Sequence, residues 1–126
     1  MANPMNWKTI RLELGSTPAH PRGSASRAYL LRLPLNDVGQ IDDQALASHP
    51  EQATVSRFWP CEPDKTGTIE KRGIGLELRC EDARAKVFTS RLQSSALTLG
   101  SEVYIEEPSG SRMPFRVAGV RSLALL

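Results

Sequence analysis

The sequence predicts a single small domain built mostly of β-strands, arranged as a barrel or a sandwich. Three observations lead to this class: short segments of alternating apolar and polar residues, turn-forming residues between them, and a length of 126 residues. The composition is typical of one folded core, with 40% hydrophobic and 24% charged residues. We expect one domain over residues 1–126, with about six or seven short strands and one short helix near residues 42–48.

The first two strands are expected on either side of a long loop. Residues 7–14 alternate apolar and polar side chains, which is typical of a strand with one buried face. Residues 15–26, GSTPAHPRGSAS, contain two prolines and two glycines without periodicity, so we expect a flexible loop. Residues 29–35 alternate again, and Pro34, which lacks an N–H donor, predicts an edge strand or the end of a strand.

Further elements follow along the chain. Asp42 is a suitable N-cap for the short helix, which His49 and Pro50 end. Strands are expected over residues 54–59, 67–71, 74–80 and, more weakly, 86–90, with Gly73 joining the second and third. Residues 91–100 fit either a short helix or an extended connection. A final hairpin is expected over residues 102–106 and 113–123, with its turn at 108–111 and a bulge near Gly119.

Charge and cysteine content favour an ordinary cytoplasmic protein. The net charge of +2 is too small to imply nucleic acid or a membrane by itself. No apolar run approaches the ~18 residues of a membrane span, and the first residues lack a secretory signal pattern. Cys61 and Cys80 are too few for a disulfide framework, so we expect a reducing compartment and a core position for Cys80.

The residues that carry metal or nucleophilic chemistry are scattered. His20, His49, Cys61 and Cys80 lie in four separate segments without zinc-type spacing, so the sequence predicts no metal and no cofactor. A nucleophile needs a base within reach, and Cys61 with His49 is the pair that would support a hydrolase or transferase. The acidic pairs 42–43, 81–82 and 106–107 are interpreted as solvated surface residues.

Aromatic residues raise the alternative of a nucleotide-binding or nucleic-acid-binding barrel. Stacking on bases would need several rings on one sheet face, together with basic residues. The candidates are Tyr29, Phe58, Trp59 and Tyr104. A core role is the interpretation we favour for them, because the chain has no excess of positive charge.

One segment has the chemistry of an anion site. The stretch HPRGSASR over residues 20–27 combines a glycine, small hydroxyl residues and two arginines, and such turns present backbone N–H groups to oxyanions. The candidate ligand-binding residues are Arg22, Gly23, Ser24, Ser26 and Arg27. Neither the dinucleotide glycine fingerprint nor the phosphate-loop pattern occurs.

The second half of the chain resembles one known family in rhythm. The segments GIGLELR at 73–79, LGSEVYIEE at 99–107 and FRVAGVRS at 115–122 are similar in order to strands of PilZ domains, small barrels that bind cyclic dinucleotides. That family also needs two arginines separated by three residues and an Asp-x-Ser-x-x-Gly turn. Here four residues separate Arg22 from Arg27, and Thr68 and Glu70 stand where Asp and Ser would precede Gly73, so no family is assigned.

The sequence therefore favours a binding module over an enzyme. Its expected partner is either another protein or a small anionic ligand, because the dense polar motifs of a small enzyme are missing. The alternatives are the hydrolase or transferase using Cys61 and His49, and the nucleotide-binding or nucleic-acid-binding barrel.

Overall fold

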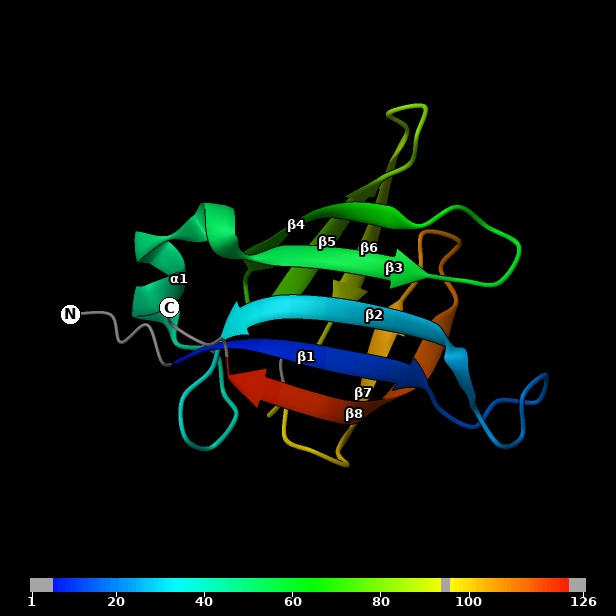
Figure 1. The fold of residues 1–126 in the computed structure, drawn as a ribbon, viewed down its shortest axis with the longest axis horizontal. Coiled ribbons are helices and arrows are strands. Elements are labelled where there is room, and N and C mark those ends of the chain that lie inside the picture. Colours follow the sequence, from blue (N-terminus) through cyan, green and yellow to red (C-terminus); the bar gives the residue numbers. More distant parts are fainter. Residues whose placement is uncertain (1–5, 94–95, 123–126) are drawn as a thin grey trace.

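The computed structural model describes residues 6–93 and 96–122, and it shows an antiparallel sheet that closes into a barrel of eight strands (Figure 1). Each strand pairs with the next along the chain, and the first pairs with the last. Closure removes the two unpaired edges that an open sheet would expose. The mostly β prediction is confirmed: a barrel forms rather than a sandwich, and it has eight strands instead of six or seven.

The eight strands lie close to the segments expected from alternation. They are β1 Trp7–Leu14, β2 Ser24–Pro34, β3 Thr54–Phe58, β4 Lys65–Arg72, β5 Gly75–Glu81, β6 Val87–Leu92, β7 Glu102–Glu106 and β8 Arg112–Ser122. Between β2 and β3 lie the helix α1, Asp43–Ser48, and the 3-10 turn η2, Pro50–Gln52. The predicted helix and the predicted final hairpin are both confirmed.

The largest difference from the sequence prediction is at the start of β2, and the segment left ambiguous is now partly assigned. Strand β2 begins at Ser24, inside the segment expected as a loop, because Ser24 pairs with Leu14 across a register shift. Its first residues are small and polar, so they carry no apolar alternation to mark a strand. Within the ambiguous segment 91–100, Arg91 and Leu92 complete β6, whereas Ser94 and Ser95 lie outside the described residues. The flexibility expected of the loop before β2 stays a prediction.

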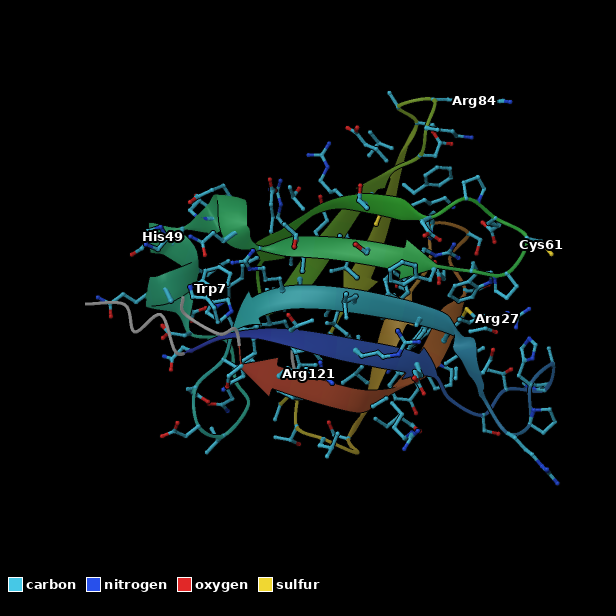
Figure 2. All side chains as sticks on the ribbon, viewed as in Figure 1. Trp7, Arg27, His49, Cys61, Arg84 and Arg121 are labelled. Atoms are coloured by element: carbon cyan, nitrogen blue, oxygen red, sulfur yellow. The ribbon has the colours of Figure 1, made fainter. Side chains whose placement is uncertain are left out.

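Helix α1 lies at one end of the barrel, on the same side as Trp7 (Figure 2). Its N-cap is Asp42, whose Oδ1 accepts from the Ala45 N–H at 3.1 Å, while Oδ2 accepts from the Asn6 side-chain amide at 2.7 Å. Ala45 and Leu46 are buried against the strands. Within the described residues, no helix is both long enough and apolar enough to cross a membrane.

The barrel interior is filled by apolar side chains from alternate strand positions. An eight-stranded barrel is just wide enough for side chains to fill it, or to hold one small ligand. Cys80 is buried in this core, as predicted. The predicted bulge near Gly119 is also confirmed: Arg11 pairs with Gly119 and Leu12 with Val117, which leaves Ala118 as the extra residue.

The opposite end of the barrel carries four loops. They connect β1 to β2, β3 to β4, β5 to β6 and β7 to β8, over residues 15–23, 59–64, 82–86 and 107–111. In Figure 1 this end lies away from α1, with the β1–β2 and β3–β4 loops at the right and the β5–β6 loop at the top. Here the side chains at inward positions change from apolar to charged.

Candidate ligand site at the open end of the barrel

A cavity of about 390 Å³ lies at the loop-bearing end of the barrel. Its volume falls within the range of small-molecule sites, roughly 300–1,000 Å³. Three charged side chains line it, from β3, β4 and the residue after β7: Arg57, Lys65 and Glu107. Its apolar wall includes Trp59, Phe88 and Met113.

The strand alternation explains why charged side chains face this cavity. Side chains two residues apart point to the same face of a strand. On β3, Val55 is buried in the core and Arg57 therefore also faces inward. Lys65 and Ile69 have the same relationship on β4, because they are four positions apart and therefore lie on the same face. The alternation that marks core positions on these two strands thus continues into charged residues toward the loop-bearing end of the barrel.

Glu107 is held in place from beneath by Tyr29. The Tyr29 hydroxyl donates to the two Glu107 carboxylate oxygens, at 3.0 and 3.1 Å, and lies 3.4 Å from the Ser90 hydroxyl. It also accepts from Arg57 Nε at 3.3 Å. Tyr29 is fully buried and Glu107 is 8% exposed. Throughout the described part of the chain, every buried side-chain nitrogen or oxygen has a hydrogen-bond partner.

Burial controls the protonation of the groups around the cavity. Burial first, and the neighbouring Glu107 charge second, raise the pKa of Tyr29 well above its ordinary value, so the phenol keeps its proton and remains a donor. Burial also raises the pKa of the Cys80 thiol, which therefore lines the cavity as a neutral wall.

Arg57 and Lys65 are cross-strand neighbours on β3 and β4, and each lies against an aromatic ring of the cavity wall. The Arg57 guanidinium carbon lies 4.0 Å from the Trp59 ring centroid, and Lys65 Nζ lies 4.1 Å from that of Phe88. Both cations also contact one carboxylate oxygen, Glu62 Oε1, at 3.4 Å from Arg57 and 3.2 Å from Lys65. The two cations are therefore positioned to share a single anionic oxygen.

Trp59 also packs against two aromatic side chains inside the barrel. Its ring centroid is 6.4 Å from that of Tyr29 and 6.3 Å from that of Phe115. Tyr29 and Phe115 meet edge to face, with their centroids 5.3 Å apart. This cluster restrains Trp59, so the ring beneath Arg57 is a rigid part of the site.

The candidate residues predicted for an anion site lie at the same end of the barrel, but outside the cavity. Arg27 donates to the Ser24 hydroxyl at 3.2 Å, and that hydroxyl is 3.0 Å from the Ser26 hydroxyl. Arg22 is exposed on the turn before β2. The Gly23 N–H donates to the His20 carbonyl at 2.8 Å, so it is engaged within the turn. Anion binding by this loop stays a prediction.

The pair considered for a hydrolase or transferase is separated by the fold. Cys61 is exposed on the loop after β3, whereas His49 follows α1 at the other end of the barrel (Figure 2). Such a placement does not allow the two side chains to act on one substrate atom. Among the described residues, no group of three or more His, Cys, Asp or Glu side chains could hold a metal ion.

Two interpretations of polar and aromatic residues need correction or refinement. The prediction that the pair 106–107 is solvated surface is wrong for Glu107, which extends the inward face of β7 beyond Ile105. The aromatic candidates for base stacking do not share a face, since Tyr29 is inside the barrel and Tyr104 is exposed. At Arg57, Lys65 and Glu107, a charged residue continues the apolar alternation of its strand. This pattern is the sequence signal that could have identified the site.

A scan against protein-family models gives no match, and neither a search of curated proteins nor one of solved structures finds a match. The resemblance to PilZ domains is therefore limited to the order of these strand segments.

Proposed function

We propose that this protein binds a small organic anion in the cavity at the open end of its barrel. The observation that carries the proposal is the convergence of two nearly buried cations, Arg57 and Lys65, on one carboxylate oxygen inside an aromatic-walled cavity. Their side chains are only 13% and 11% exposed. An anionic ligand placed there would meet both cations and an apolar wall.

The energetic cost of these residues supports a functional role. Removing a charged group from water costs several kcal/mol, and apolar residues of similar volume are often neutral or more stabilising at such sites. A barrel end closed with Leu or Val would meet the needs of folding alone. Arg57, Lys65 and Glu107 instead line a cavity of about 390 Å³ beside the aromatic cluster. This combination is typical of ligand sites in barrel mouths.

The structure favours binding over catalysis for the same cavity. Burial raises the pKa of Tyr29, so its hydroxyl keeps its proton and donates to Glu107. Tyr29 itself does not line the cavity. The Cys80 thiol is likewise kept neutral. A reducing compartment such as the cytoplasm is part of the proposal, because Cys61 and Cys80 are both free.

Calorimetric titration tests this function. The probes are phenylacetate, octanoate and phenyl phosphate, with neutral phenylacetamide as the comparison ligand. We expect at least one anion to bind, and Lys65→Met to weaken it by about tenfold or more, since a lost charge-assisted contact is worth roughly 1.5–3 kcal/mol. Arg79, exposed on the outer face of β5, supplies the control Arg79→Met, which should bind as the wild type does. Absence of binding for all three anions, or equal affinity of Lys65→Met and the wild type, would overturn the proposal.

A further inference from the structure

We infer that the ligand is a monocarboxylate with an apolar body, and that its carboxylate takes the position now held by the Glu62 side chain. This inference rests on the proposed function and specifies the chemical class of the ligand. It also assigns Glu62 a role as a tethered competitor, a carboxylate of the chain itself that the ligand must displace.

The contacts of Glu62 define the position of the incoming carboxylate. Its Oε1 is the oxygen that both Arg57 and Lys65 contact, at 3.4 and 3.2 Å. The Glu62 side chain is 41% exposed, whereas the two cations are almost buried. The cations are thus fixed from within the barrel, and the carboxylate reaches them from the rim. A ligand carboxylate could replace the Glu62 carboxylate without moving Arg57 or Lys65.

The loop that carries Glu62 is short and anchored next to the cavity. The Glu62 N–H donates to the Trp59 carbonyl at 3.3 Å, which closes a turn directly after β3. Within that turn, Cys61 has a φ of 64°, a conformation that L-residues rarely adopt. The turn directs the Glu62 side chain back toward the residue pair that it contacts.

The charge of the cavity selects a monoanion over a dianion. Arg57 and Lys65 contribute two positive charges, and the buried Glu107 carboxylate lies 3.8 Å from Arg57 Nη2. With Glu62 displaced, the three groups leave one net positive charge for a ligand. A carboxylate neutralises this charge, whereas a phosphate dianion would place an excess negative charge beside Glu107 in a poorly solvated site.

The rest of the lining indicates what the carboxylate is attached to. The apolar wall next to the cations is formed by Trp59, Phe88 and Met113. The protonated Cys80 thiol extends this wall. A ligand with a flat ring or a short alkyl chain would remove this surface from water while its carboxylate stays at the rim. Phenylacetate and octanoate represent these two shapes.

The test compares Glu62→Gln with Asp64→Asn by titration with phenylacetate and octanoate. Both variants remove one negative charge from the same loop, but only Glu62 contacts the two cations. We expect Glu62→Gln to bind either carboxylate about threefold to tenfold more tightly than Asp64→Asn, the range for losing partly exposed ion pairs. Phenylacetamide should bind neither variant measurably, and phenyl phosphate should bind the wild type more weakly than phenylacetate.

The outcomes separate this inference from the proposed function. If the wild type binds a carboxylate and the two variants have equal affinity, Glu62 is no competitor and the inference fails while the proposed function stands. Tighter binding of phenyl phosphate than of phenylacetate would likewise reject the monocarboxylate and keep the anion site. If no anion binds to any variant, both fail together.

Discussion

The Tyr29 hydroxyl donates to both oxygens of the Glu107 carboxylate, 78 positions away in the sequence. Tyr29 lies on β2, and Glu107 directly follows β7. The contact therefore ties the start of the β7–β8 turn to the barrel interior. It also gives the nearly buried Glu107 carboxylate a hydrogen-bond donor where it lines the cavity.

The first prediction concerns stability at alkaline pH. Above about pH 10 a tyrosine of the unfolded chain ionises, whereas Tyr29 keeps its proton in the folded protein because burial and Glu107 raise its pKa. The folded state then binds more protons, so the free energy of unfolding falls as the pH rises, by up to about 1.4 kcal/mol per pH unit. Tyr29→Phe should remove this part of the dependence, whereas the part due to the Cys80 thiol, whose pKa is also raised by burial, should remain. Denaturant titrations over this pH range measure the slope.

The control for this prediction is the other tyrosine. Tyr104 is an exposed residue of β7 whose hydroxyl donates to Glu102 at 2.5 Å. Tyr104→Phe should keep most of the alkaline loss. At neutral pH, Tyr29→Phe should cost about 1–3 kcal/mol, because Glu107 loses its donor. An unchanged alkaline slope in Tyr29→Phe would refute the assigned role of the phenol.

A second prediction concerns the close approach of β4 and β5. A Cβ at Gly67 would collide with the carbonyl oxygen of Arg79, and backbone atoms must then shift. Gly67→Ala should therefore lower the free energy of unfolding by about 1–3 kcal/mol. At Gly119 the nearest atom to an added Cβ is Arg11 Cβ at 3.8 Å, so Gly119→Ala should stay within about 0.5 kcal/mol. Equal effects of the two changes in denaturant titrations would contradict this account.

A third prediction concerns the cap of the helix at the other end. Asp42→Ala removes the bonds from the Ala45 N–H and the Asn6 amide, and should cost about 0.5–2 kcal/mol. Asp43→Ala removes the same charge next to it but only an exposed ion pair with Lys71, so its loss should be clearly smaller. Thermal unfolding of both variants under identical conditions compares them.

The acid dependence of the same cap provides an independent check. The backbone bond from Ala45 first, and Asn6 second, lower the pKa of Asp42 below its ordinary value of 3.8. Its stabilisation is therefore present above that value and is lost as the pH falls through the lower folded-state pKa. Asp42→Ala should show a flatter loss of stability in acid than the wild type. Parallel acid curves would argue against the cap.

Much of the fold could be predicted because its strands alternate cleanly. Residues 7–14 and 102–106 have the bounds expected from period-two patterning, and Gly73 has the positive φ expected of the turn that joins β4 to β5. The expected count of six or seven strands is too low because residues 86–90 show only a weak strand pattern, although Val87–Leu92 forms β6. Closure of the barrel depends on pairing between β1 and β8, which local patterns do not reveal.

The site was harder to predict because its residues come together only through closure. Arg57, Lys65 and Glu107 are far apart in the sequence, and each resembles a surface charge in isolation. Their position on the inward parity of β3, β4 and β7 was the available signal, but it requires knowing which face becomes the interior. The turn before β2 has the more recognisable local pattern, because glycine and arginine together resemble phosphate-binding loops.

The most direct measurement of the central claim is the nuclear magnetic resonance spectrum of the two tryptophan indole N–H groups during titration with phenylacetate. Trp59 lines the proposed site, and Trp7 lies at the opposite end of the barrel, so each molecule contains its own control. The account predicts a saturable shift of the Trp59 signal, together with the amides of Phe88 and Glu107, and no shift of Trp7. Unchanged Trp59, Phe88 and Glu107 signals at millimolar phenylacetate, or shifts confined to residues 15–27, would contradict it.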